Sequence, residues 1–190
     1  IGADCALGVG QDYSAAVVLN ADREVCAVYR NNKLDPTQYG DLLFYLGRYY
    51  NNALLAVESN SLGIATLNRL KQMDYVNLYH QTKVANVSNE EGTRLGWRTT
   101  QATKPMIIGH LKNAIENDDI DLASPVIIKE CMTYVADESG RTNAMSGCND
   151  DTVIATAIAL EVLRTHADRL STTRVSFRNQ AYTPDNTQWL

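Results

Sequence analysis

Short apolar runs fill the beginning of the chain, and polar turns separate them. The first run carries one carboxylate, Asp4, and the next two runs lie at residues 13–19 and 24–29. A turn with Gly8 and Gly10 joins the first two runs, and an Asn-Ala-Asp turn joins the second to the third. Apolar runs of this length between turn residues predict strands, and connections this short predict an antiparallel meander.

Helical spacing begins after the third run. The sequence Asp35-Pro36-Thr37-Gln38 has Asp as N-cap, Pro in the first turn and Gln three residues after the cap, which predicts the start of a helix. The apolar side chains that follow at helical spacing are expected to face the core, and they are Leu42, Leu43, Leu46, Tyr49 and Tyr50.

Strands and helices then alternate as far as residue 79. An apolar run at 53–57 ends in Glu58 and predicts a buried strand, and residues 76–79 predict a further one. Between them, residues 59–61 are expected to cap a helix that runs through Met73, with Ile64, Leu67 and Leu70 on its inner face. Three antiparallel strands followed by helix, strand, helix and strand predict an α/β fold, a mixed sheet flanked by helices.

The periodic pattern is lost between residues 82 and 100, so this polar stretch is expected to be a functional hairpin or a mobile loop. A helix is predicted at 103–117, and its expected inward residues are Ile107, Ile108, Leu111 and Ile115. Ser124-Pro125 begins another short element, and Ser139-Gly140 is expected to turn between two short strands.

The last strong helix is predicted at residues 152–164, after Asn149-Asp150-Asp151 as its cap. It is apolar nearly all round and is therefore expected to be buried against the sheet. We expect one domain at residues 1–167 and a flexible tail at 168–190.

Composition narrows the class of protein. A chain of 190 residues suffices for one α/β domain, and its net charge of −5 argues against a whole-surface nucleic-acid binder. No apolar run approaches the ~20 residues that a membrane helix needs. The four cysteines form no CxxC pair, and three of them lie in apolar stretches, as reduced and buried thiols would. Because the first residue is Ile, we expect a piece of a longer protein.

Three segments that the pattern places side by side carry acids. Asp4 lies on the first strand, Glu58 follows a later strand, and Asp150 and Asp151 precede the last helix. Carboxylates that converge at a point open to water repel one another unless a hard cation is present. Ligands of this kind suit Mg²⁺ or Mn²⁺, and two such ions can hydrolyse a phosphodiester. The sequence therefore predicts a divalent-metal site that acts on phosphate.

Each acid also fits a structural role. Asp4 can cap a strand end, Glu58 can cap the following helix, and Asp150 or Asp151 can cap the last helix. Only one member of that last pair can cap, which leaves the other to bind. The scattered histidines, including His80 and His110, lie in apolar patterns and are expected to be structural. No GxGxxG leads into a helix, and the 190 residues contain no GxxxxGK[ST] phosphate loop.

Several motifs occur in an order that points to one family. They are Gly2-Ala3-Asp4 through Gly8-Val9-Gly10 to Ala15, Val57-Glu58-Ser59-Asn60, Leu95-Gly96-Trp97-Arg98 with Thr103-Lys104-Pro105, and Gly147-Cys148-Asn149-Asp150-Asp151 before an alanine-rich helix. Together they resemble the nuclease domain of viral genome-packaging terminase large subunits, of the tailed-bacteriophage type, over about residues 1–165. Many members have His before the acidic pair, where this chain has Asn149.

The resemblance implies a ribonuclease H-like fold and two-metal cleavage of double-stranded DNA. Asp4, Glu58 and Asp150 or Asp151 match the metal-binding, catalytic acids of the family, and the expected cofactor is Mg²⁺ or Mn²⁺, as two ions. Four cations between residues 83 and 104 are then expected to hold the DNA backbone, and they are Lys83, Arg94, Arg98 and Lys104.

The expected partners are double-stranded DNA, an ATPase motor domain of the same full-length chain, the small terminase subunit and the portal protein. We expect this assembly in the host cell cytoplasm, with no membrane partner. Three alternatives stay open at this point. The chain can be a RuvC-like resolvase or transposase core, an actin-like phosphate-binding module built on Asp4, the glycine turn and Ser14, or a non-catalytic interaction domain whose acids are only caps.

Overall fold

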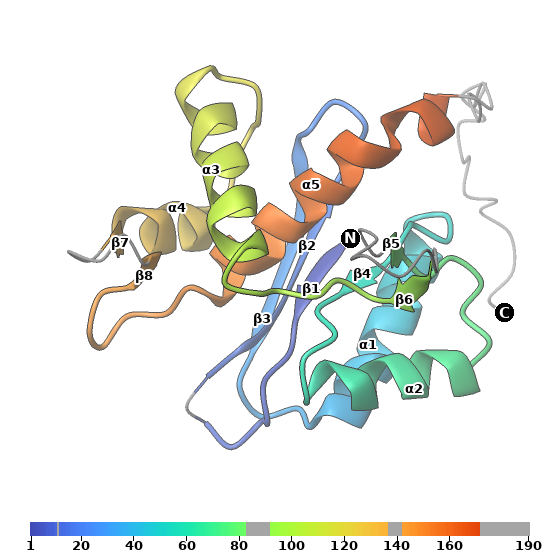
Figure 1. The fold of residues 1–190 in the computed structure, drawn as a ribbon. Coiled ribbons are helices and arrows are strands. Elements are labelled where there is room, and N and C mark those ends of the chain that lie inside the picture. The colour runs from blue at the N-terminus through green and yellow to red at the C-terminus, as the bar shows by residue number, and fades with distance from the viewer. Residues whose placement is uncertain (11, 83–91, 137–141, 172–190) are drawn as a thin grey trace, which may run out of the picture.

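The computed structural model describes residues 1–10, 12–82, 92–136 and 142–171. They form three layers, a central sheet with helices on both faces (Figure 1). Helices α1 (Pro36–Tyr49) and α2 (Gly63–Gln72) cover one face. Helices α3 (Thr103–Glu116), α4 (Pro125–Met132) and α5 (Asp151–Ser171) cover the other. The predicted mixed α/β architecture is therefore confirmed.

The sheet has the strand order β3-β2-β1-β4. Strands β1 (Gly2–Asp4), β2 (Ser14–Leu19) and β3 (Val25–Asn31) pair antiparallel, which confirms the predicted meander. Strand β4 (Ala56–Val57) pairs parallel with β1. The predicted strand at 76–79 is reduced to a single parallel bridge between Leu78 and Leu55, and Val76 is 81% exposed.

Helix α1 begins as the sequence predicts. The Asp35 side chain accepts from the amides of Thr37 and Gln38, and the Gln38 side chain accepts in return from the Asp35 amide. The inward side chains were only partly predicted. Leu43 is buried, but Tyr49 is 80% exposed, and on α2 Leu67 and Leu70 are buried while Ile64 is 52% exposed. These helices present a narrow apolar stripe to the sheet, so apolar residues outside that stripe remain in water.

Helix α5 lies directly on β1 and β2 and is buried along its first twelve residues, as predicted. The approach is close at Gly2, where a Cβ would stand 2.1 Å from the Ala155 carbonyl oxygen. Any larger residue would therefore push the helix off the sheet. The helix continues to Ser171 and not, as predicted, to Arg164, so the expected domain boundary at residue 167 falls inside it.

Two short hairpins extend from these layers. Strand β5 (His80–Thr82) pairs antiparallel with β6 (Thr93–Leu95), so the ends of the polar stretch form the expected hairpin. Strand β7 (Tyr134–Ala136) pairs antiparallel with β8 (Thr142–Ala144), as the sequence predicts.

Two further expectations concern the cysteines and membrane-spanning helices. Of the four free cysteines, Cys5 is buried and Cys131 is half-buried, but Cys26 and Cys148 are exposed, so the prediction of buried thiols holds only in part. Within the described residues, every helix is too short or too polar to span a bilayer.

Candidate functional site

The topology of the sheet brings two predicted acids to the same end of two neighbouring strands. Asp4 is the last residue of β1, and Glu58 follows the last residue of the parallel strand β4. The Glu58 amide donates to the Ala3 carbonyl at 2.8 Å, which fixes the backbone beside Asp4. The carboxyl ends of neighbouring parallel strands are a common position for ligand sites in open α/β sheets.

The Asp4 carboxyl is held where ionisation is unfavourable. Burial raises its pKa well above 3.8, and the Glu58 carboxyl raises it further through its charge and through hydrogen bonding. The charge of Asp151 adds to the rise, and only the Cys5 amide, which donates to Asp4 Oδ1 at 2.8 Å, opposes it. Asp4 therefore lies within electrostatic reach of both Glu58 and Asp151.

Asp151 is the first residue of α5 and is 8% exposed. Burial, together with the charges of Glu130 and Asp150, raises its pKa to about 6, against the opposing charge of Arg30. Its Oδ2 atom is buried without a hydrogen-bond partner. A buried carboxylate oxygen without a partner is costly unless a cation or a proton compensates it.

Asp150 points elsewhere. Its Oδ2 lies 3.4 Å from the Lys104 ammonium, which also donates to Asn143 at 3.0 Å. Lys104 stands in the first turn of α3, and the Thr103 hydroxyl, which donates to the Arg98 carbonyl at 3.0 Å, fixes the chain just before it. Of the two neighbouring acids, Asp150 thus pairs with a cation, whereas Asp151 keeps a buried oxygen without a partner.

Glu58 is held by a side chain of its own segment. The Asn60 amide group donates to Glu58 Oε2 at 2.7 Å, while Asn60 Oδ1 accepts from the Gly63 amide at the start of α2. Asn60 therefore provides the acceptor at that helix end, a role that the sequence also allowed for Glu58. The Glu58 carboxylate is oriented toward the site by this contact.

The predicted DNA-binding cations are placed unequally. Arg98 is exposed and follows Trp97, which pairs with Glu58 in a parallel bridge, so Arg98 lies at the same end of the sheet as the acids. Arg94 is exposed on β6, and Lys104 is engaged by Asp150. Lys83 lies outside the described residues.

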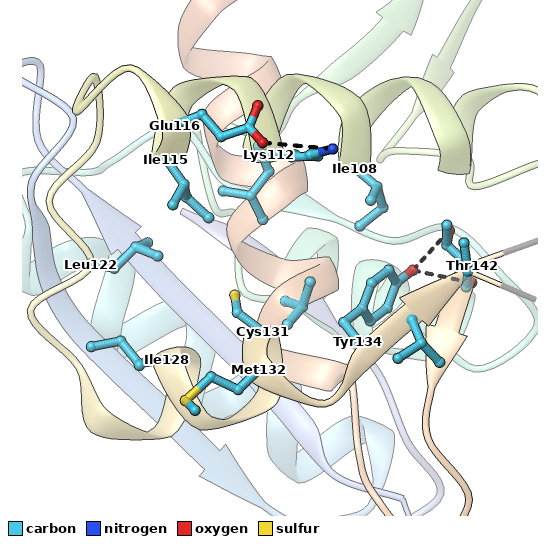
Figure 2. A pocket seen from close by; sticks show the side chains of 14 residues that line it. Ile108, Lys112, Ile115, Glu116, Leu122, Ile128, Cys131, Met132, Tyr134 and Thr142 are labelled. Atoms are coloured by element: carbon cyan, nitrogen blue, oxygen red, sulfur yellow. Dashed lines mark hydrogen bonds and ion pairs between the residues drawn. The ribbon is translucent and has the colours of Figure 1, made fainter.

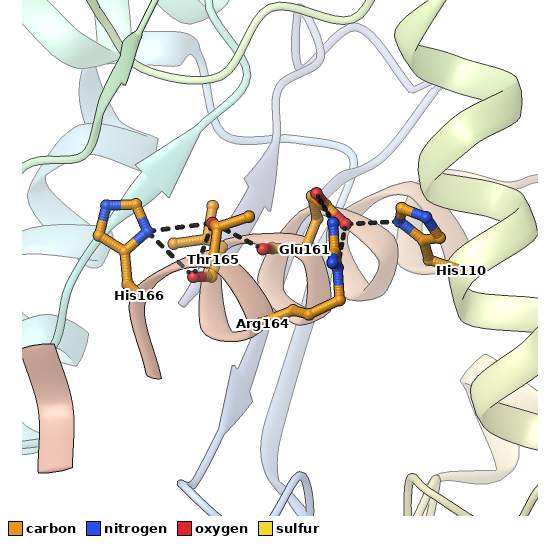
Figure 3. Close-up of polar contacts among 6 residues, drawn as sticks. His110, Glu161, Arg164, Thr165 and His166 are labelled. Atoms are coloured by element: carbon orange, nitrogen blue, oxygen red, sulfur yellow. Dashed lines mark hydrogen bonds and ion pairs between the residues drawn. The ribbon is translucent and has the colours of Figure 1, made fainter. Parts of the chain in front are cut away.

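Sequence reasoning missed two buried acids with polar partners. Glu130 of α4 is 6% exposed, accepts from the Thr152 amide at 2.8 Å and lies 3.1 Å from Arg30. Glu161 of α5 is 3% exposed and lies between His110 and Arg164 (Figure 3). Both positions carry an acid inside an apolar helical pattern, and this is the sequence signal that could have identified them.

An apolar cavity lies apart from the four predicted acids. It has a volume of about 630 Å³ and opens between α3, α4 and the β7–β8 hairpin (Figure 2). Side chains such as Ile108, Leu111 and Ile128 line it, and none of the four predicted acids does. It explains why Ile115, predicted to be core, is 39% exposed, since this side chain stands at the cavity wall.

The donor set fits a hard divalent cation. Asp4 and Asp151 both have raised pKa values, and Asp151 Oδ2 is a buried oxygen without a partner, so a cation would relieve a cost that the fold itself creates. In the described part of the chain, no three His, Cys, Asp or Glu side chains are gathered closely enough to hold a metal ion as they stand. The assignment of Asp4, Glu58, Asp150 and Asp151 as ligands stays a prediction.

Solved structures share this fold. The chain matches the large terminase nuclease from thermophilic phage G20c with bound magnesium at a TM-score of 0.65 and 21% identity, over 84% of this chain and 78% of that one. The same nuclease with bound cobalt matches at 0.64 and 20% identity, with the same coverage. No protein-family model and no curated protein matches. At the level of the fold, the predicted resemblance to terminase nucleases is confirmed.

Proposed function

We propose that this chain is a divalent-metal-dependent endonuclease that cuts double-stranded DNA during viral genome packaging, the nuclease domain of a terminase large subunit. The observation that carries the proposal is the position of Asp4 and Glu58 at the carboxyl ends of the neighbouring strands β1 and β4, with the Asp151 carboxylate within electrostatic reach of Asp4 and one of its oxygens buried without a partner. The solved nuclease with this fold has bound magnesium or cobalt, which supports the use of a divalent metal by this chain.

Asp4, Glu58 and Asp151 would hold two Mg²⁺ or Mn²⁺ ions, with Asp150 next to Asp151 in the sequence. When bound, such ions activate water and stabilise the leaving oxygen of a phosphodiester. Asn60 orients Glu58 through its hydrogen bond, and the Tyr13 backbone, hydrogen-bonded to Asp151, helps to fix that carboxylate. Lys104 holds Asp150 through the 3.4 Å ion pair.

The remaining parts of the proposal follow from this role. Arg94 and Arg98, with Lys83 and Lys104, bind the phosphate backbone of double-stranded DNA. The chain works with an ATPase motor domain of the same full-length protein, the small terminase subunit and the portal protein, in the host cell cytoplasm.

The test is plasmid cleavage. Purified protein is expected to nick or linearise supercoiled plasmid with Mg²⁺ or Mn²⁺, without ATP and with little sequence preference, and EDTA is expected to stop the reaction. Supercoiled plasmid that survives a wide range of protein and metal concentrations would contradict the proposed function.

The DNA-binding cations allow a matched comparison. Arg94→Glu/Arg98→Glu is expected to weaken DNA binding and cutting and to flatten the salt dependence of binding, because fewer phosphates are neutralised. The control is Arg48→Glu/Lys71→Glu. It makes the same change of charge in the last turns of α1 and α2. Fluorescence anisotropy with a labelled duplex at several salt concentrations measures both. Equal affinity of the two double variants would remove Arg94 and Arg98 from the interface.

A further inference from the structure

The first turn of α5 has an unusual source for its hydrogen bonds. A helix begins with amides that have no partner within the helix, and a side chain of the same turn commonly provides the acceptor. Here the Thr152 amide donates at 2.8 Å to Glu130, which comes from α4 and lies 22 residues earlier in the sequence. The Thr152 hydroxyl donates to the same carboxylate oxygen.

Arg30 makes this buried carboxylate tolerable. Its Nε lies 3.1 Å from Glu130 Oε1, although the two atoms are not aligned as a hydrogen bond. The Arg30 guanidinium also stacks on the Tyr13 ring at 3.4 Å from the ring centroid. Because Glu130 is only 6% exposed, an unpaired charge there would be strongly unfavourable. The Arg30–Glu130 pair therefore gives α5 an acceptor without adding net charge beside Asp151.

We propose that Glu130 is a positioning residue, which holds the first turn of α5 and with it the backbone that carries the Asp151 carboxylate. Asp151 immediately precedes Thr152, so the two hydrogen bonds to Glu130 fix the backbone that carries it. The consequence for metal binding rests on the proposed function. The consequence for the order of the first turn of α5 does not.

Two double variants separate geometry from charge. Arg30→Met/Glu130→Gln keeps an amide oxygen that can accept from Thr152, whereas Arg30→Met/Glu130→Met removes the acceptor. Neither leaves an unpaired buried charge, and apolar replacements of buried ion pairs are generally tolerated. Glu161→Gln is the control, since it removes another buried carboxylate from the same helix at a distance from Asp151.

Two measurements are made on each protein. Hydrogen exchange of the amides at residues 151–154 in metal-free protein reports the order of the first turn. Titration calorimetry with Mn²⁺ alone reports affinity. Arg30→Met/Glu130→Met is expected to exchange faster in this turn and to lose about 10–100-fold in Mn²⁺ affinity, the usual effect of removing a partner that orients a ligand. The Gln double variant is expected to stay close to wild type in both measurements, and Glu161→Gln is expected to stay close to wild type in Mn²⁺ affinity.

Each contrary result has one meaning. If the Met double variant matches wild type in exchange and affinity, Glu130 does not position Asp151 and the proposal is overturned. If the Gln double variant exchanges as fast and loses as much Mn²⁺ affinity as the Met double variant, the charge and not the acceptor matters. That result also overturns the proposal. If wild type binds no Mn²⁺, the proposed function fails, while the exchange rates still decide whether Glu130 orders this turn.

Discussion

The two ends of the buried part of α5 treat a buried carboxylate in opposite ways. Asp151 and Glu161 are 8% and 3% exposed, so burial alone disfavours the ionised form of both. Around Asp151, burial and the charges of Glu130 and Asp150 act in the same direction, and its pKa rises to about 6. Around Glu161, burial also acts to raise the pKa, but hydrogen bonds and charges from Arg164 and His110 outweigh it and the pKa falls (Figure 3).

The difference shows that the neighbouring side chains decide the direction in which the pKa of a buried acid shifts, since both acids are buried to a similar extent. Glu161 has Arg164 Nη2 at 2.9 Å and His110 Nδ1 at 2.7 Å, which is a satisfied structural network joining α3 to α5. Asp151 has a buried oxygen without a partner and a second acid, Asp4, within reach. The first arrangement needs nothing more, whereas under the proposed function a cation would stabilise the second.

The largest expected contrast is in cutting. Asp151→Asn is expected to reduce plasmid cleavage to background, because it removes the charge of a proposed metal-holding carboxylate. Glu161→Gln is expected to cut like wild type at temperatures where both are folded. Cleavage assays with Mg²⁺ and with Mn²⁺ compare the two. Equal activity of both variants would erase the functional distinction between the two ends of the helix.

Glu161→Gln, which is expected to leave cutting unchanged, is expected to reduce stability. Glu161→Gln is expected to lower the free energy of unfolding by about 2 kcal/mol, since hydrogen bonds to a charged group are lost or weakened. For a chain of this size that is about 4–8 °C in Tm. Thermal melts followed by circular dichroism measure it. An unchanged Tm would mean that the His110–Glu161–Arg164 network contributes no net stability.

Asp4→Asn is expected to change stability in the other direction. The substitution keeps an acceptor for the Cys5 amide and removes a charge that burial and Glu58 disfavour. In EDTA the variant is expected to melt higher than wild type, by about 1 kcal/mol of unfolding free energy, and to gain less from millimolar Mn²⁺. Paired melts with EDTA and Mn²⁺ decide this. A variant that melts lower in EDTA and responds to Mn²⁺ like wild type would identify Asp4 as a simple strand-end acceptor.

The smallest effect is a pH dependence. The pKa of Glu161 is lower in the folded protein than its ordinary value of 4.5. The stability from its network is therefore fully present above about pH 4.5 and is lost as pH falls through the folded pKa. The Tm difference between wild type and Glu161→Gln is expected to narrow from pH ~7 to pH ~3. A difference that stays constant over this range would show that packing, and not charge, accounts for the stability of the network.

Local sequence signals found most of the secondary structure. The Asp35 capping box and the helix at 103–117 rest on residues close together in the chain, and the structure has both. Patterns failed where a side chain's environment depends on distant elements. Tyr49 and Ile64 fit an apolar helical stripe yet stand in water, and the last helix continues past Arg164.

The candidate site was likewise predictable from the sequence only in part. The sequence alone marked Asp4, Glu58, Asp150 and Asp151, because isolated acids at strand ends and before a helix are visible in a linear pattern. It also gave the three-strand meander that places the first of them. Only the tertiary structure decided that Asp150 pairs with Lys104 while Asp151 has a buried oxygen without a partner, and that Glu130 provides the acceptor for Thr152 from another helix. The physical reason is that propensity and capping act between neighbours in the chain, whereas the partners of a buried charge are set by which elements pack around it.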